Sequence, residues 1–326
     1  MGSEQLAAIN EQFSFVVSED DRIDKVLASY LNVSRNQAEK LIEKGFVSIN
    51  NKIISKTSQK VHTGDMVSYI LPEVEQKEAM NIDFDIEILY EDEHLMVINK
   101  PSGLVVHPAP SVKEPTLVDW LIKKGISLST ISGEERHGIV HRIDKDTTGA
   151  LVIAKTNEAH EALSLQLEDK TMGRYYLAII DYPLKEDITI EKNIARNSTN
   201  RLKMAVVKRG RFAKSAFAKL SLGKNNIELI AAKLYTGRTH QIRVHLAHLG
   251  RHILGDNLYG YRGKDMSRVF LHARLIYFKH PKTNEIVEFE APLFADMKEF
   301  LDSNFETNYI DLITPEAIKG VFSASC

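Results

Sequence analysis

Residues 141–154 read HRIDKDTTGALVIA, a polar loop that leads directly into an apolar segment. Asp, Thr and Gly side chains favour tight turns in which a side chain bonds its own backbone. The apolar residues 150–154 have the length and composition of a buried strand. Loops held by such strands often present catalytic groups. Judged from this loop alone, however, Asp144 is more often a turn residue than a catalytic carboxylate.

The chain around this loop alternates strand-like segments with loops and few helices. Adjacent strand pairs with few crossover helices predict an α+β fold around a mostly antiparallel sheet. Thr239 is expected to cap the last of the helices and Gly250 to end it. The predicted strands are 95–99, 151–155, 175–180, 227–234, 269–278 and 285–291, and the predicted helices are 116–123, 157–167 and 239–249.

The first seventy residues show a different pattern, two short helices followed by a hairpin. Apolar residues from Ile23 to Leu31 have helical spacing. A second helix is predicted to begin at the capping box Ser34–Gln37 and to end at Gly45. Strands are expected at 46–50, 52–54 and 66–71, joined by turns at Asn50-Asn51 and Gly64-Asp65.

These patterns and the length of 326 residues favour two domains. Residues 1–72 would form the small helical domain, with a core at about 20–71. An acidic linker is expected at 73–86, followed by a larger domain at 87–303. The last segment, 304–326, has weak periodicity, which fits either a docked helix or a frayed tail.

The composition is that of a water-soluble globular protein, with 43% hydrophobic and 26% charged residues. The single cysteine, Cys326, excludes a disulfide framework and a thiolate metal site. The N-terminus has neither the basic start nor the apolar segment of a signal peptide. The apolar runs are too short to span a bilayer. We therefore expect a cytoplasmic protein, and a monomer by default.

Opposite charges are separated along the chain although the net charge is only −2. Residues 22–60 carry eight Lys or Arg against three acids, and residues 192–224 carry ten against none. Acidic residues concentrate at 73–93 and 285–316, nine against one Lys in each. The two basic zones could attract the phosphates of a nucleic acid or could simply be solvated faces.

Further motifs occur in a fixed order: NKPSGLVVHP at 99–108, RYYLA at 174–178, TGRTHQIRVHLAHLG at 236–250, LGDNLYG at 254–260 and FLHARLIYFKHP at 270–281. Together with the loop at 141–149, this set resembles the RluA-type pseudouridine synthases over most of residues 87–300. Residues 20–71 resemble the small αL RNA-binding domain of a small-subunit ribosomal protein and of tyrosyl-tRNA synthetases. The combination is most similar to the RluD branch, which modifies large-subunit ribosomal RNA.

The resemblance implies an enzyme that isomerises specific uridines to pseudouridine, most directly in large-subunit (23S) ribosomal RNA. Such an enzyme breaks a carbon–nitrogen glycosidic bond, turns the uracil and forms a carbon–carbon bond. The reaction needs no redox change, nucleotide energy or metal, so no cofactor is expected. The implied partner is ribosomal RNA, free or within the assembling large subunit.

The same resemblance assigns the catalytic roles to Asp144, Arg243 and Tyr176. Asp144 would be the catalytic carboxylate, acting either on the anomeric carbon or as a base at the 2′ position. Arg243 would be its partner, because a buried carboxylate needs a permanent positive charge to stay ionised. Tyr176 would stack on the flipped base and return roughly 1–3 kcal/mol of the cost of unstacking. Tyr175 would then point to the other face of the strand.

By the same resemblance, Arg142 would either fill the vacancy that the flipped nucleotide leaves in the RNA or pair with the displaced neighbouring bases. The other expected RNA contacts are His141, Thr147, Arg238, His240 and Lys100 in the larger domain, and Arg35, Lys40, Lys44 and Lys52 in the smaller one.

The cluster His240, His245, His248 and His252 has the residue type of a zinc site. Because the implied reaction needs no metal, polar packing and phosphate contacts are the preferred roles. Two other functions compete with the synthase. One is a non-catalytic RNA-binding or ribosome-assembly factor. The other is a glycosidase or nucleosidase, which generally requires two paired carboxylates.

Overall fold

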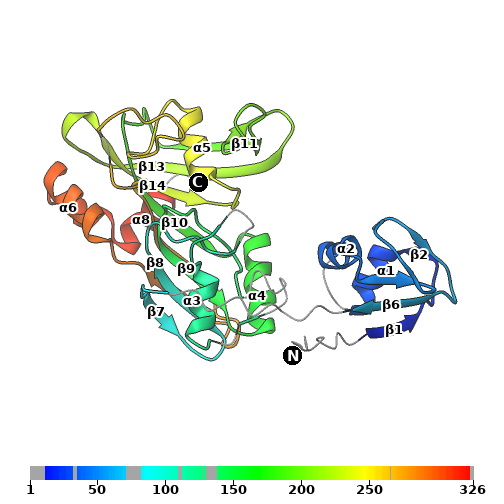
Figure 1. The fold of residues 1–326 in the computed structure, drawn as a ribbon. Helices are drawn as coiled ribbons and strands as arrows, with labels where there is room; N and C mark the ends of the chain where they lie inside the picture. Colours follow the sequence, from blue (N-terminus) through cyan, green and yellow to red (C-terminus); the bar gives the residue numbers. More distant parts are fainter. Residues whose placement is uncertain are drawn as a thin grey trace, which may run out of the picture. The chain divides into compact units, whose positions relative to one another are not determined.

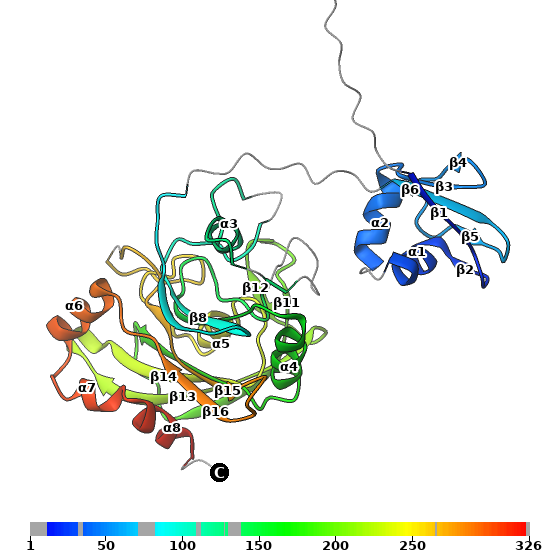
Figure 2. The same ribbon diagram turned by 90° about the horizontal axis from the view of Figure 1, so that it is seen from below.

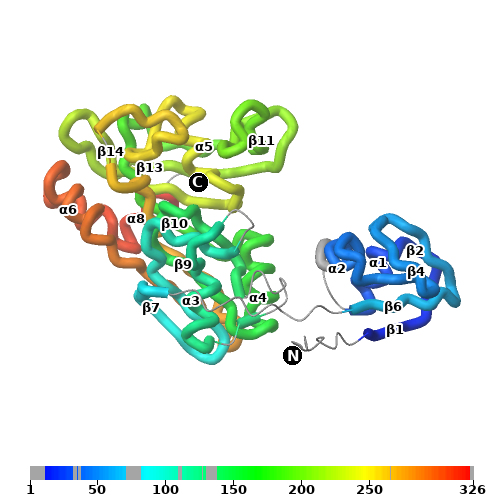
Figure 3. The backbone as a smooth tube through the Cα atoms, in the orientation of Figure 1, coloured from blue at the N-terminus to red at the C-terminus, as the bar shows by residue number. Residues whose placement is uncertain are grey.

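The computed structural model describes residues 12–31, 35–70, 82–108, 112–126, 128–129, 138–264 and 266–323. The chain divides into two compact units near residue 80 (Figure 1), and the path of the backbone through each can be followed in Figure 3. Within the described ranges, no helix combines the length and the apolar character that crossing a membrane would require.

The smaller unit packs two helices against a four-stranded sheet. The sheet has the order β1-β6-β3-β4. Asn50 and Asn51 have φ values of 48° and 65°, as a two-residue hairpin turn requires, so the predicted turn is confirmed. Gly45, with φ of 75°, follows the second helix as predicted. The elements are β1 (Gln12–Val16), β2 (Asp21–Arg22), α1 (Ile23–Leu31), α2 (Arg35–Glu43), β3 (Val47–Ile49), β4 (Lys52–Ile53), β5 (Lys60–Val61) and β6 (Met66–Ile70).

A buried carboxylate joins the two helices of this unit. Asp24 is fully buried, and its Oδ2 accepts hydrogen bonds from Arg22 and Arg35 at 2.9 and 2.8 Å. Burial alone would raise the pKa of Asp24, but the two guanidinium groups outweigh it and the pKa is lowered. Arg35 therefore has a structural partner in this unit. The predicted capping box lies outside the described residues, because Ser34 is not among them.

The larger unit is built on one ten-stranded sheet with the order β12-β11-β13-β14-β10-β15-β9-β8-β7, and β16 pairs with β15. Every pair is antiparallel except β9 with β15, which confirms the predicted α+β class. The strands are β7 (Glu87–Glu91), β8 (Leu95–Lys100), β9 (Thr148–Ala154), β10 (Gly173–Ile180), β11 (Ile188–Arg196), β12 (Met204–Val206), β13 (Arg211–Leu222), β14 (Glu228–Leu234), β15 (Leu271–Lys279) and β16 (Ile286–Glu290).

The six predicted strands are confirmed as β8, β9, β10, β14, β15 and β16, with ends shifted by a few residues. The sequence did not predict β7 or the basic strands β11, β12 and β13. In β13 both ends are exposed and only the middle is buried, so the apolar pattern covers less than half of the strand. The basic zone at 192–224 is therefore largely a set of sheet strands rather than a loop.

Helices cover both faces of the sheet (Figure 2). Tyr175 packs on α8, with its ring centroid 5.7 Å from that of Phe322, whereas the next residue, Tyr176, faces α5. The C-terminal residues 304–323 therefore continue the core of this unit instead of forming a separate tail. The helices are α3 (Leu117–Lys123), α4 (Asn157–Glu168), α5 (Gln241–His248), α6 (Ala295–Asn304), α7 (Tyr309–Leu312) and α8 (Pro315–Ser323).

The parallel contact between β9 and β15 fixes the end of the loop at 141–149. Gly149 lies opposite Ala273 and has φ of +110°, a conformation that favours glycine. A Cβ atom at this position would lie 2.2 Å from the carbonyl oxygen of Ala273. Only glycine allows the two backbones to approach this closely where the loop meets its strand.

Replacing Gly149 with Ala is expected to lower the free energy of unfolding by about 2–5 kcal/mol, since both backbone strain and a steric clash are introduced. Gly125→Ala is the matched control, because Gly125 also has positive φ (+68°) but no atom within 4 Å of the added Cβ. Its expected loss is about 1–2 kcal/mol, from strain alone. Equal losses in urea denaturation would contradict the close-approach explanation.

Candidate active site

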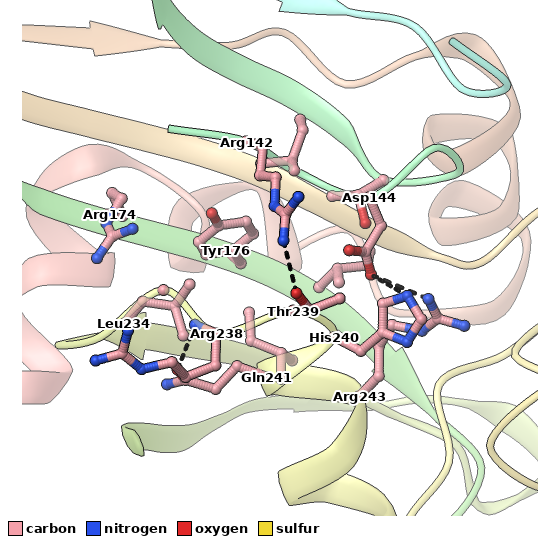
Figure 4. Close-up of a pocket in the computed structure, with 15 residues that line it drawn as sticks. Arg142, Asp144, Arg174, Tyr176, Leu234, Arg238, Thr239, His240, Gln241 and Arg243 are labelled. Carbon is pink, nitrogen blue, oxygen red and sulfur yellow. Dashed lines mark hydrogen bonds and ion pairs between the residues drawn. The ribbon is translucent and has the colours of Figure 1, made fainter. Parts of the chain in front are cut away.

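A pocket opens where the loop at 141–149, β10 and the segment 234–243 meet (Figure 4). Residues from three motifs that are far apart in the sequence thus line the same pocket. Asp144, Tyr176 and Arg243 all contribute to it, so the fold brings the three predicted catalytic side chains together. The lining contains a single carboxylate, that of Asp144.

Arg243 forms hydrogen bonds with two carboxylates at once. Its Nη1 donates to Asp144 Oδ2 at 3.0 Å. Its Nε and Nη2 donate to the two oxygens of Asp256 at 2.7 and 2.8 Å, a bidentate arrangement. The Arg243 side chain is 8% exposed and that of Asp256 is 1% exposed, whereas 23% of Asp144 remains accessible from the pocket.

The surroundings of Arg243 keep its charge in place. Burial by itself would lower the pKa of Arg243, but the bonds to Asp256 and Asp144 more than offset it, and the pKa is raised. The guanidinium carbon also lies 4.9 Å from the ring centroid of Tyr259. A fixed cation therefore lies beside Asp144, with its Nη1 at 3.0 Å from Asp144 Oδ2.

His240 forms the second contact to Asp144. Its Nε2 lies 3.9 Å from Asp144 Oδ2, and its Nδ1 shares a hydrogen bond of 2.8 Å with the Tyr259 hydroxyl. Burial lowers the pKa of His240 despite the neighbouring Asp144. The imidazole is therefore neutral at pH 7, and the permanent cation beside Asp144 is Arg243.

The predicted capping of α5 by Thr239 is wrong. The N-cap is His240, in a left-handed conformation (φ 56°) and without a side-chain capping bond. The Thr239 hydroxyl instead accepts a hydrogen bond of 2.8 Å from Arg142 Nη2 (Figure 4). The turn before the helix is held by Gln241, whose Oε1 accepts from the Arg238 backbone N–H and the Thr236 hydroxyl.

Lys100 is buried under the loop at 141–149. Its ammonium group is 0% exposed and donates to the carbonyl oxygens of Pro101, Leu104 and Lys145 at 2.8–2.9 Å. Burial lowers the pKa of Lys100 to about 7. The structure therefore corrects the expected RNA contact, because every N–H of this ammonium is used to hold the backbone next to Asp144.

His141 also points inward rather than toward the pocket. Its Nε2 accepts a hydrogen bond of 3.2 Å from the Val152 backbone N–H, and its Nδ1 is buried without a partner. Burial lowers the pKa of His141 to about 3, so the ring is neutral. It supports the loop through the bond to Val152, and because Nε2 accepts, the proton of the neutral ring lies on the unpartnered Nδ1, so its contact with RNA remains a prediction.

The remaining predicted contacts line the pocket or lie on the surface of the smaller unit. Thr147 and Arg238 line the pocket, and Thr147 also closes the loop through its N–H to the Asp144 carbonyl at 3.1 Å. In the smaller unit, Lys40, Lys44 and Lys52 are exposed. Their contacts with RNA remain predictions.

Sequence reasoning missed the roles of Asp256 and Tyr259. Both lie in the motif LGDNLYG at 254–260, which contributed to the resemblance but received no role. The available signal was a carboxylate within this short motif. Its partner could not be read from the sequence, because the turn between 249 and 256 decides which side chain it meets.

Three of the four histidines near α5 bond different partners, and His240 bonds Tyr259 as described above. His245 shares a hydrogen bond with Ser215, and His252 bonds Asp181 at 2.8 Å. Among the residues that the structure describes, no group of three His, Cys, Asp or Glu side chains is placed to hold a metal ion.

Comparisons with known proteins match both units. Residues 94–248 match the model of the RNA pseudouridylate synthase family, and residues 21–67 match that of the S4 domain. An uncharacterized RNA pseudouridine synthase of Helicobacter pylori is 47% identical, over 90% of this chain and 93% of its own. Ribosomal large subunit pseudouridine synthase D of Zymomonas mobilis is 37% identical, over 91% and 96%.

The fold is also found in solved structures. Human RNA Pseudouridylate Synthase Domain Containing 1 aligns with a TM-score of 0.52 at 22% identity, covering 67% of this chain and 94% of that one.

An S4 domain followed by a pseudouridine synthase domain defines an RNA-modifying isomerase. The chain belongs to the RluA-type family of RNA pseudouridine synthases, whose relatives include ribosomal large subunit pseudouridine synthase D. The predicted family, fold and αL domain are thereby confirmed, the last as the S4 domain. The chain is a pseudouridine synthase, and its substrate is RNA.

Asp256→Asn is expected to destabilise the protein by on the order of 3 kcal/mol, because it removes one charge of a buried ion pair without changing its size. Glu191→Gln breaks the exposed pair with Lys214 and serves as the control, with an expected loss of less than about 1 kcal/mol. Thermal unfolding of both variants measures the difference. If Asp256→Asn is no more harmful than the control, Asp256 does not anchor Arg243.

Proposed function

We propose that this enzyme isomerises uridines of large-subunit (23S) ribosomal RNA, with Asp144 as its catalytic carboxylate and without a cofactor. One observation carries the catalytic assignment. Asp144 is the single carboxylate of the pocket that also holds Tyr176, and one of its oxygens is held by Arg243. The other oxygen, Oδ1, makes no hydrogen bond within the described residues and is free to meet the substrate.

The isomerisation balances without an external reagent. The bond between the sugar and N1 of uracil breaks, the base turns, and C5 bonds to the sugar. The proton that leaves C5 is replaced by one on N1. Asp144 can begin this sequence by attacking the anomeric carbon or by removing the 2′ proton, and both routes require its ionised form.

Tyr176 and Arg142 complete the proposed handling of the base. Tyr176 is 4% exposed and presents its ring to the pocket next to Asp144. Stacking on such a ring returns roughly 1–3 kcal/mol, similar to the few kcal/mol that flipping a base costs. Arg142 is exposed at the pocket mouth, positioned to occupy the vacancy in the RNA.

The substrate assignment is supported by relatives that are similar over both domains. Three of them are named ribosomal large subunit pseudouridine synthase D, at 37% identity. The S4 domain and the basic strands β11 to β13 add positive surface, which favours a polyanion. We also propose that the enzyme acts as a monomer.

The pocket disfavours a glycosidase. Paired acid and base catalysis needs two accessible carboxylates. Asp256, the other carboxylate bonded to Arg243, is 1% exposed and has both oxygens bonded to that arginine. It is not available as an acid or base.

Asp144→Asn is expected to abolish pseudouridine formation while leaving the fold intact. In cells that lack the gene, complementation with wild type should restore pseudouridine at specific positions of large-subunit ribosomal RNA. The Asp144→Asn variant should restore none. Asp146→Asn is the matched control, because Asp146 is an exposed residue of the same loop, and this variant should restore the modification fully.

Mapping pseudouridines in total RNA from these strains tests both the catalytic assignment of Asp144 and the assignment of large-subunit ribosomal RNA as the substrate. Equal modification with wild type and Asp144→Asn would remove the catalytic assignment. Restored positions that lie only in transfer RNA would instead remove the substrate assignment.

A further inference from the structure

Arg174, on β10 two residues before Tyr176, is a buried cation without a protein partner. It is 7% exposed, and its Nε is buried without a hydrogen-bond acceptor. Neither a hydrogen bond nor an ion pair links its guanidinium to any residue that the structure describes. Burial lowers its pKa, and Arg238 adds repulsion. Buried arginines are ordinarily paired, because desolvating the charge costs several kcal/mol.

The position of Arg174 suggests what its partner is. It lines the active-site pocket and also an adjoining groove. The groove lining contains five Lys or Arg side chains and one carboxylate, that of Glu168. The cations are Arg142, Lys170, Arg174, Arg211 and Arg238. A concave surface with this excess of positive charge attracts anions.

The backbone at Gly237 lies close to the Arg174 guanidinium. A Cβ atom at Gly237 would lie 2.8 Å from Arg174 Nη1, so the absence of a side chain at Gly237 leaves room for the guanidinium. Alternate residues of a strand share a face, at roughly 3.3 Å rise per residue. Arg174 therefore lies along β10 from Tyr176, on the side away from Asp144 (Figure 4).

We propose that Arg174 binds one backbone phosphodiester of the RNA next to the uridine that lies over Tyr176. Its planar fork suits two phosphate oxygens, and Arg238 and Arg211 at the rim add positive charge. A uracil carbonyl would satisfy one N–H but leave the buried charge uncompensated. The assignment rests on the proposed function, since it requires a uridine in the pocket.

The test uses an RNA fragment that the enzyme modifies, in versions that replace one phosphodiester at a time by a neutral methylphosphonate. Proteins carry Asp144→Asn so that RNA is not converted during the titration. The Asp144→Asn protein, which keeps Arg174, should bind RNA about 10- to 100-fold more weakly when the methylphosphonate replaces one particular linkage beside the target uridine. This is the effect expected from the loss of one charge-assisted contact. With Arg174→Met added, binding of unmodified RNA should be weaker by the same factor. The methylphosphonate at that linkage should then cause no further loss.

Two further measurements separate phosphate binding from a structural role. The slope of log affinity against log salt should fall by about one with Arg174→Met. Thermal stability without RNA should be unchanged or higher, because an unpaired buried cation is removed. Lys224→Met removes a charge outside the groove, where Lys224 Nζ bonds the Ser303 carbonyl, and should change affinity less than twofold.

An Arg174→Met protein that still loses affinity at the same linkage would overturn the proposal. A lower melting temperature with an unchanged salt slope would also overturn it, since that pattern marks a structural arginine. Either failure leaves the cellular test of Asp144 unaffected, because the titrations involve no catalysis.

Discussion

The bridge from Asp144 through Arg243 to Asp256 is the interaction on which the rest of the site depends. None of the three groups is stable there alone, because a buried charge without a partner costs several kcal/mol. The two bonds to Asp256 fix the guanidinium plane, and the third bond then sets the position of the Asp144 carboxylate. The position of the Asp144 carboxylate therefore depends on three segments folding correctly: the loop at 141–149, α5 and the segment at 254–260.

The sheet beneath this bridge supplies the rigidity. Gly149 brings the end of the catalytic loop against β15, and Lys100 holds the backbone carbonyl of Lys145 from below. On the other side of the pocket, β10 presents Tyr176 inward and Tyr175 toward α8. Arg174 Nε, which is buried without a protein partner, lies in the lining of the same pocket. Stability is reduced locally where RNA has to be bound, a common compromise at functional sites.

Much of this arrangement could be predicted from the sequence. Long apolar runs identified the central strands, and the motif order placed Asp144, Tyr176 and Arg243 in one site. The basic strands β11 to β13 were missed because their Lys and Arg residues interrupt the apolar alternation. Lys100 and Arg35 were assigned to RNA through the resemblance, although both donate to acceptors within the protein. Asp256 required the fold, since only the turn after α5 brings its carboxylate to Arg243.

A single substitution tests whether the geometry of the bridge, rather than its charge, supports catalysis. Arg243→Lys keeps one positive charge but cannot bond two carboxylates in a fixed plane. Under single-turnover conditions, the rate of pseudouridine formation should fall by about 100-fold, the effect of a misplaced catalytic group. RNA affinity should remain within about twofold, as expected when the net charge is unchanged. A folded Arg243→Lys enzyme with a rate close to that of wild type would contradict the central role of the bridge.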